Sequence, residues 1–248
     1  MGHESGRVAT DPAQLARDMV ALYNQGNALS EAGLLEQAVA AYDQAVEKSG
    51  PSDDRLQANI VAYALFNKAI ALRDLGRTED EIATYDELLE HVGGSTDPIR
   101  LDQVAKALVN KGIALSKLDR EQEEIDVYQQ LIDGFSDSPL EQIQRQVARA
   151  LVYQAVSVGH VRTYDDELQI YDRVLERYDG TSDPNIRVSI AMALIKKAIV
   201  LGWLGRDTEE LGVYDDILRR YKGESDEELA EIVRAAEKLR ADALFEQT

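Results

Sequence analysis

The sequence predicts an all-α protein, a right-handed α-solenoid of five helical hairpins followed by a C-terminal helix. The first observation is a repeat of 43 residues, marked by a tyrosine at each step: Tyr42, Tyr85, Tyr128, Tyr171 and Tyr214. The second is that apolar residues within each repeat recur at helical spacing. The third is a break, often at a glycine, that divides the repeats into two helical stretches. A fixed period of this length is typical of solenoids, in which each unit buries its apolar face only against its neighbours.

The two helical stretches of a repeat differ in length and charge. In the first, side chains such as Leu108 and Leu115 lie on one face of a long helix. The break at residues 118–120, Leu-Asp-Arg, corresponds to Leu-Gly-Arg at residues 75–77, where glycine suits a left-handed helix stop. The second stretch is shorter and opens with acidic residues.

Capping residues, several of them followed by proline, mark the starts of the long helices. They are Asp11-Pro12, Ser52-Asp53, Asp97-Pro98, Ser138-Pro139, Asp183-Pro184 and Ser225-Asp226. We therefore expect six first helices near residues 12–32, 52–75, 98–118, 139–161, 184–204 and 226–245. Five second helices are expected near residues 35–48, 78–92, 120–134, 164–178 and 207–221.

These elements predict one array over residues 11–248, preceded by a flexible leader at residues 1–10. The repeats are expected at residues 11–50, 51–94, 95–137, 138–180 and 181–223, with a terminal helix at 224–248. That last helix has no second helix to pair with. It is expected either to cap the array or to continue into a longer natural chain beyond Thr248.

The first repeat carries a family resemblance. Residues 21–51 read ALYNQGNALSEAGLLEQAVAAYDQAVEKSGP, with small, apolar and aromatic residues at characteristic places: Leu22, Gly26, Leu29, Gly33, Ala38, Tyr42, Ala45 and Pro51. This pattern resembles a tetratricopeptide repeat (TPR), with Leu22 where that family has a tryptophan. The period is 43 rather than about 34 residues, so the chain resembles a long-repeat TPR-like variant. The resemblance implies a non-catalytic module that binds proteins.

Composition excludes several classes of function. The chain of 248 residues has no cysteine, so disulfides and thiolate metal sites are impossible. The net charge of −19 disfavours nucleic acid as a partner. No apolar run is long enough for a membrane span and no signal peptide is visible, so we expect a cytoplasmic protein without a membrane partner.

No catalytic constellation, metal site or cofactor site is expected. The three histidines, His3, His91 and His160, show no ligand-like spacing. Clusters of carboxylates such as residues 123–126 are interpreted as solvated helix faces. Gly93-Gly94 lacks the following lysine and the preceding strand of a phosphate-binding loop.

A column of glutamates replaces the small residue Ala38 of the first repeat. Its members are Glu81, Glu124, Glu167 and Glu210. On the first helices of the same repeats lie Lys68, Lys111, Gln154 and Lys197. We expect ion pairs between the two columns within each repeat, with a hydrogen bond where Gln154 faces Glu167.

Charge separates between the two kinds of helix. Four central stretches of first helix, residues 55–75, 99–118, 140–162 and 185–204, carry 13 basic and 3 acidic residues. The second-helix stretches 78–90, 120–133, 164–178 and 207–221 carry 5 basic and 21 acidic ones. In the family that the chain resembles, first helices line a concave groove. The resemblance therefore implies a comparatively basic groove for an acidic or carboxylate-bearing protein segment. The candidate partner-binding residues are Asn67, Lys106, Asn110, Arg149, Tyr153, His160, Lys196 and Trp203.

Three other interpretations stay open at this point. Some TPR domains clamp a terminal carboxylate, and Asn27, Asn67 and Lys106 match part of that pattern, although the match is incomplete. The chain could instead be a self-assembling or regulatory repeat segment of a larger signalling protein, in which case its oligomeric state is the discriminating property. His160 and Trp203 fall in register and could line a small-molecule pocket.

Overall fold

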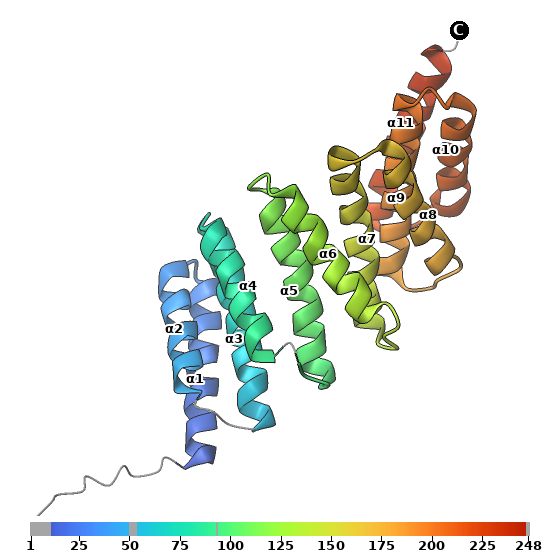
Figure 1. Ribbon diagram of the computed structural model, residues 1–248. Coiled ribbons are helices and arrows are strands. Elements are labelled where there is room, and N and C mark those ends of the chain that lie inside the picture. Colours follow the sequence, from blue (N-terminus) through green and yellow to red (C-terminus); the bar gives the residue numbers. More distant parts are fainter. Residues whose placement is uncertain (1–10, 50–53, 93, 247–248) are drawn as a thin grey trace, which may run out of the picture. The chain divides into compact units, whose positions relative to one another are not determined.

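The computed structural model describes residues 11–49, 54–92 and 94–246, and this part of the chain folds into eleven α-helices without a strand (Figure 1). The first helices of the repeats and the terminal helix are α1 Pro12–Glu31, α3 Arg55–Asp74, α5 Pro98–Ser116, α7 Glu141–Val161, α9 Pro184–Trp203 and α11 Glu227–Glu246. The second helices are α2 Leu35–Lys48, α4 Thr78–Val92, α6 Glu121–Phe135, α8 Tyr164–Tyr178 and α10 Asp207–Tyr221. The predicted all-α class and the alternation of long and short helices are confirmed. The predicted leader, residues 1–10, lies outside the described residues.

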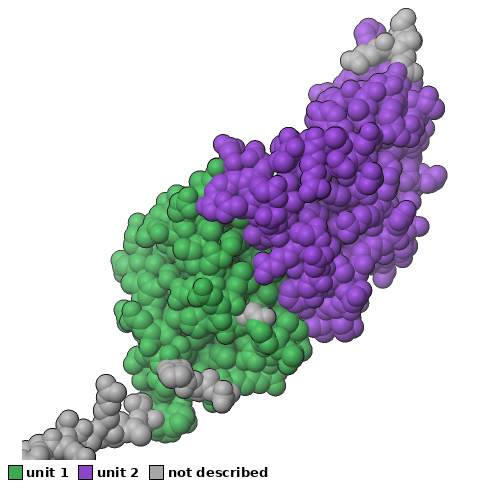
Figure 2. Space-filling view, viewed as in Figure 1, with its two compact units in different colours: residues 1–118 green, residues 119–248 purple. Residues whose placement is uncertain are grey.

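The chain forms two compact units, residues 1–118 and 119–248, coloured separately in Figure 2. Unit 1 holds α1 to α5, and unit 2 holds α6 to α11. Within each unit every helix packs on the next along the chain. The first helices also pack on one another, α1 on α3 and α3 on α5 in unit 1, and α7 on α9 and α9 on α11 in unit 2. Each unit therefore has a layer of first helices, which we call its inner layer. The single array over residues 11–248 stays a prediction.

Aspartates start most of the first helices, as the sequence predicts. The side chains of Asp11, Asp97, Asp183 and Asp226 accept hydrogen bonds from backbone N–H groups of the first turn. The predicted start at Ser52-Asp53 lies outside the described residues, and Asp54 caps α3 instead. The predicted start at residue 139 is wrong by two residues. Leu140 precedes α7 and gives no side-chain cap, because its side chain has no acceptor.

The breaks between the two helices of a repeat use left-handed backbone. Gly33, Gly76 and Gly205 have φ of 74°, 73° and 66°, the region that glycine adopts without strain. In the third repeat Asp119 takes the same conformation, with φ of 53°. Aspartate tolerates this region better than most residues do. The left-handed turn therefore forms at this position without a glycine.

The five register tyrosines form the centre of the core, as predicted. Each is at most 1% exposed. In the first hairpin, Tyr42 packs over Gly26, where an added Cβ would lie 2.4 Å from the ring. Its hydroxyl donates to Asn27 Oδ1 at 2.8 Å. The spacing of the tyrosines therefore sets the spacing of the hairpins.

A polar pair recurs between each second helix and the first helix that follows it, always 25 residues apart. Lys68 Nζ lies 2.6 Å from Asp43 Oδ1, and Lys111 Nζ lies 2.5 Å from Asp86 Oδ1. The corresponding pairs in unit 2 are Gln154 with Gln129, Lys197 with Asp172 and Arg240 with Asp215. We call these contacts the junction pairs.

The junction pairs correct the ion pairs predicted from the sequence. Lys68, Lys111 and Lys197 bind aspartates of the preceding repeat and not the glutamate column of their own. Lys68 also lies 3.7 Å from Glu87 of its own repeat, which is not part of that column. Gln154 Nε2 likewise donates to Gln129 Oε1 at 3.0 Å, and not to Glu167. The sequence contains the signal, because amide replaces carboxylate at Gln129 where amide replaces lysine at Gln154.

The Gln129–Gln154 pair supplies a matched test of the charged junctions. Lys111→Gln should lower the free energy of unfolding by about 0.5–1 kcal/mol, because it leaves Asp86 without its partner in a half-exposed setting. The double variant with Asp86→Gln recreates the neutral pair and should recover most of that loss. Urea unfolding of the wild type, both single variants and the double variant gives the coupling energy. Additive losses would show that the junction pair contributes nothing.

The terminal helix α11 should hold the last hairpin together. It packs on α9 and α10, and it buries Leu229, Val233 and Ala236. A chain that stops at Gly223 loses this burial, which stabilises by roughly 4 kcal/mol. Hydrogen exchange should then show reduced protection in residues 184–221 before the rest of unit 2. Unchanged protection there would contradict a capping role.

Candidate partner-binding groove

The inner layer of unit 1 is occupied by a polar network. Asn67 Nδ2 on α3 donates to Asn27 Oδ1 at 2.9 Å and to the Tyr23 hydroxyl at 3.3 Å. Tyr42 donates to the same Asn27 oxygen. Asn27, Asn67 and Tyr42 also line a pocket of about 370 Å³. The amide of Asn67 thus helps to join the first two repeats, and it lies beside a small opening on this layer.

The two other candidate residues of unit 1 lie on α5. Lys106 Nζ pairs with Asp102 of the same helix, at 2.7 Å from its Oδ2. Asn110 is half-buried and lies beside the hydroxyl of Tyr85. No hydrogen bond joins Lys106 or Asn110 to Asn67 among the described residues, and the terminal-carboxylate clamp stays a prediction.

The inner layer of unit 2 contains a larger pocket, of about 540 Å³. Arg149 and Tyr153 on α7 line one wall, Met192 on α9 lies next to them, and Glu228 and Glu231 on α11 line the opposite wall. The guanidinium of Arg149 sits 5.9 Å from the centre of the Tyr153 ring. The structure therefore brings two predicted residues together in one pocket, and adds two acids that the sequence reasoning did not select.

The remaining candidates lie toward the other end of the first helices. Lys196 is half-buried on α9 and His160 is exposed near the end of α7. Trp203, the last residue of α9, is 66% exposed and lines a separate pocket of about 450 Å³. His160 does not line that pocket. The small-molecule site between His160 and Trp203 stays a hypothesis.

Most cations of the first helices have acidic partners inside the fold. Four cations of the inner layer, Lys68, Lys111, Lys197 and Arg240, form junction pairs. Others bind acids that precede the next first helix: Arg145 Nε lies 2.7 Å from Asp183 Oδ2, and Arg187 binds Glu224 at the same distance. Much of the predicted charge separation is thus structural. Arg149 and Lys196, by contrast, have no carboxylate within 4.0 Å among the described residues.

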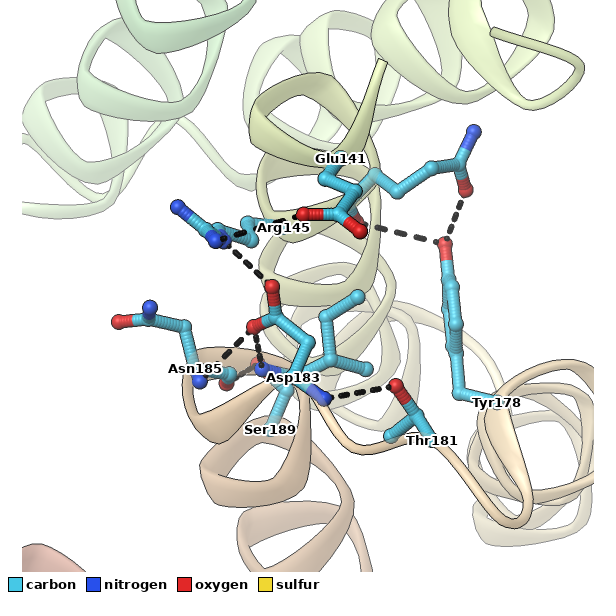
Figure 3. Close-up of polar contacts among 9 residues, drawn as sticks. Glu141, Arg145, Tyr178, Thr181, Asp183, Asn185 and Ser189 are labelled. Atoms are coloured by element: carbon cyan, nitrogen blue, oxygen red, sulfur yellow. Dashed lines mark hydrogen bonds and ion pairs between the residues drawn. The ribbon is translucent and has the colours of Figure 1, made fainter. Parts of the chain in front are cut away.

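Figure 3 shows one of these structural clusters, at the start of α9. Asp183 accepts from the backbone N–H groups of Asn185 and Ile186, and its other oxygen binds Arg145 of α7. Burial alone would raise the pKa of Asp183, but these hydrogen bonds outweigh it and hold the pKa below its usual value. The cluster joins consecutive first helices, so we assign it to the fold and not to ligand binding.

Comparison with known proteins gives a family match over part of the chain. Residues 23–98, from α1 to the start of α5, match the family model described as tetratricopeptide repeat. The match supports the resemblance seen in the first repeat, and the inner layer is the surface to which that resemblance points.

Solved structures share the fold of this repeat protein at low sequence identity. A structure of PilF from Pseudomonas aeruginosa has a TM-score of 0.57 and 16% identity, covering 93% of this chain and 88% of that one. BtubC from P. vanneervenii has a TM-score of 0.56 and 15% identity, with 94% and 83% covered. A tetratricopeptide repeat protein from Parabacteroides merdae has a TM-score of 0.52 and 12% identity, with 92% and 89% covered. No curated protein is similar enough in sequence to count as a match.

The described residues offer neither a membrane-spanning helix nor a cluster of metal ligands. No helix there is both long and apolar enough to cross a membrane. No three or more acidic or histidine side chains there come together as a group that could hold a metal ion.

The glutamate column of the repeat protein is buried behind the inner layer. Glu81, Glu124 and Glu167 are at most 5% exposed. Glu167 accepts a hydrogen bond from the Tyr171 hydroxyl at 2.7 Å and fits against Gly159, where a Cβ would lie 2.0 Å from its Oε2. Burial raises the pKa of Glu167, and the Tyr171 hydroxyl and the charges of His160 and Lys196 oppose this only in part.

Sequence reasoning could have found the acids that line the unit 2 pockets. Glu228 and Glu231 lie 43 residues after Asn185 and Val188, which line the same pocket. Extending the repeat step into the terminal helix would have placed both acids on the inner layer.

The buried glutamate predicts a pH dependence of stability. A carboxyl group whose pKa is raised in the folded state binds protons more readily there, so its contribution to stability is greatest at low pH and falls as pH rises through the folded pKa. Glu167→Gln keeps an acceptor for Tyr171 and removes the charge. The variant should melt at a higher temperature than the wild type at pH 7, with the difference shrinking toward pH 4.

Thermal melts between pH 4 and 8 provide the measurement. Glu176→Gln, an exposed change on the same helix, is the matched control and should leave the pH profile unchanged. Identical profiles for the wild type and Glu167→Gln would contradict the raised pKa.

Proposed function

We propose that this chain is a non-catalytic interaction module of the tetratricopeptide-repeat kind, whose inner layer binds an acidic or carboxylate-bearing protein segment. The observation that carries the proposal is that Arg149 and Lys196 remain without carboxylate partners in a fold that pairs many of its other inner-layer cations with acids. A cytoplasmic location, expected from the sequence, belongs to the same proposal.

The pocket at Arg149 has the features that such a segment requires. Val152, Val188 and Met192 provide an apolar wall for a side chain of the partner. Arg149 is held over Tyr153 by a cation–π contact and can present its guanidinium to a carboxylate, the anion that its planar fork fits best. The acids on α11 disfavour a second carboxylate on the opposite wall and thereby orient the bound segment.

The test uses charge reversal at three cations of the inner layer. Lys106→Glu, Arg149→Glu and Lys196→Glu together should abolish binding of acidic segments on an array of short peptides of defined composition. The last two should account for most of the loss, because Lys106 already pairs with Asp102. The melting temperature should change little, since these side chains are half-exposed and contribute under about 1 kcal/mol each.

The matched control reverses two cations of the junction pairs, Lys68→Glu and Lys197→Glu. It should lower the melting temperature and leave peptide binding intact in the fraction that stays folded. Should the groove variant melt early and still bind acidic peptides, the cations of the inner layer are structural and the proposal is wrong.

A second candidate function is self-association of the repeat segment. It is favoured by Leu244 and Phe245 near the end of α11, which are 40% and 82% exposed. Light scattering across a range of protein concentrations separates the two functions, because a mass that rises with concentration indicates self-association.

A further inference from the structure

The only tryptophan of the chain lies on the surface next to a second aromatic ring. Trp203, at the end of α9, is 66% exposed. The ring of Tyr164, at the start of α8, lies 5.6 Å from it between centroids, at 47° between planes. Large aromatic side chains are normally buried, and an exposed pair marks a surface that contacts something else.

Trp203 forms one side of the 450 Å³ pocket between α9, α10 and α11. Ile199, Leu239 and Ala243 provide apolar walls, and the charged groups are all acidic: Asp207, Glu210 and Asp242. No lysine or arginine lines this pocket. The combination differs from the Arg149 pocket, where a cation faces two acids.

The three carboxylates are not equivalent. Glu210 packs over Gly202 and is engaged with Tyr214, so it belongs to the hairpin. Asp207 and Asp242 form no ion pair in the described part of the chain. The acids do not form a group that could hold a metal ion. Two carboxylates without an ion pair beside an exposed indole favour a cation that is organic and partly apolar.

We propose that this pocket, which we call the tryptophan pocket, binds an arginine or lysine side chain of a protein segment. The methylene stem would lie on Ile199 and Leu239, as long cationic side chains do on apolar surface. The charged head would lie between the carboxylates of Asp207 and Asp242 and the face of Trp203, which adds a cation–π attraction. The inference rests on the proposed function in that the ligand is a protein segment, but it uses different residues and the opposite charge.

The two sites together give the inner layer of unit 2 a polarity. Arg149 and Lys196, on α7 and α9, select acidic groups, and the tryptophan pocket at the ends of α9 and α11 selects a basic one. The partner segment is then one of mixed charge whose direction along the layer is fixed by the order of its acidic and basic residues.

The emission of Trp203 tests the proposal directly, because no other tryptophan contributes. The probes are three capped tripeptides with leucine on both sides of arginine, glutamine or glutamate. The arginine peptide should change the emission saturably, with a Kd of about 1 mM. The glutamine and glutamate peptides should bind at least about ten-fold more weakly.

Variants separate this pocket from its neighbour. Asp207→Asn combined with Asp242→Asn should weaken binding of the arginine peptide about ten-fold. Glu228→Gln combined with Glu231→Gln removes the same number of negative charges from the Arg149 pocket and should leave that binding unchanged. Circular dichroism confirms that the variants are folded. Equal responses to the arginine and glutamine peptides, or no loss in the Asp207 and Asp242 variant, would overturn the proposal.

Two further results complete the test. The variant with Arg149→Glu and Lys196→Glu should keep the full response of Trp203 to the arginine peptide, so failure of the proposed function would leave this result intact. Emission that changes with protein concentration and not with peptide would mean that a second copy of the chain covers Trp203, which also overturns the proposal.

Discussion

A buried tyrosine ring stands at the same place in every repeat of this chain, and the packing within each unit depends on these rings. The five rings are almost completely buried. In the first hairpin the opposing helix must carry glycine, because the ring of Tyr42 occupies the space of a side chain at Gly26. Once the ring is in place the angle between the two helices has little freedom, and the next hairpin packs against a surface that is already fixed.

Polar contacts then fix how one hairpin meets the next. The junction pairs and the aspartates that start the first helices use many of the inner-layer cations that might otherwise recognise a ligand. A count of charges on the first helices therefore overestimates how basic the binding surface is. The cations that matter for recognition are those that the fold leaves unpaired, and on α7 and α9 these are Arg149 and Lys196.

The helices could be predicted well from the sequence because apolar periodicity and the signals that start and stop a helix are local properties. Apolar spacing, aspartate caps and left-handed glycines act within one or two turns, and they placed most helix ends within two residues. The pairing of charges could not be predicted in the same way. Lys68 has acidic residues both 13 positions ahead and 25 positions behind it, and only the packing of adjacent hairpins decides that Asp43 is the partner. The two pockets of unit 2 also depend on the terminal helix. Its pocket-lining residues can be identified from the sequence only by extending the 43-residue period beyond Tyr214.

The one uncharged junction, Gln129 with Gln154, gives unit 2 an uneven response to its ionic surroundings. Dissolved salt screens the lysine–aspartate and arginine–aspartate contacts over a Debye length of about 8 Å at physiological strength, and over less as salt is added. An amide–amide hydrogen bond carries no net charge and is not screened in this way. The junction pair between α6 and α7 therefore keeps its strength as the ionic strength rises. The charged junction pairs between α8 and α9 and between α10 and α11, next to the helices that line both pockets, weaken first in concentrated salt.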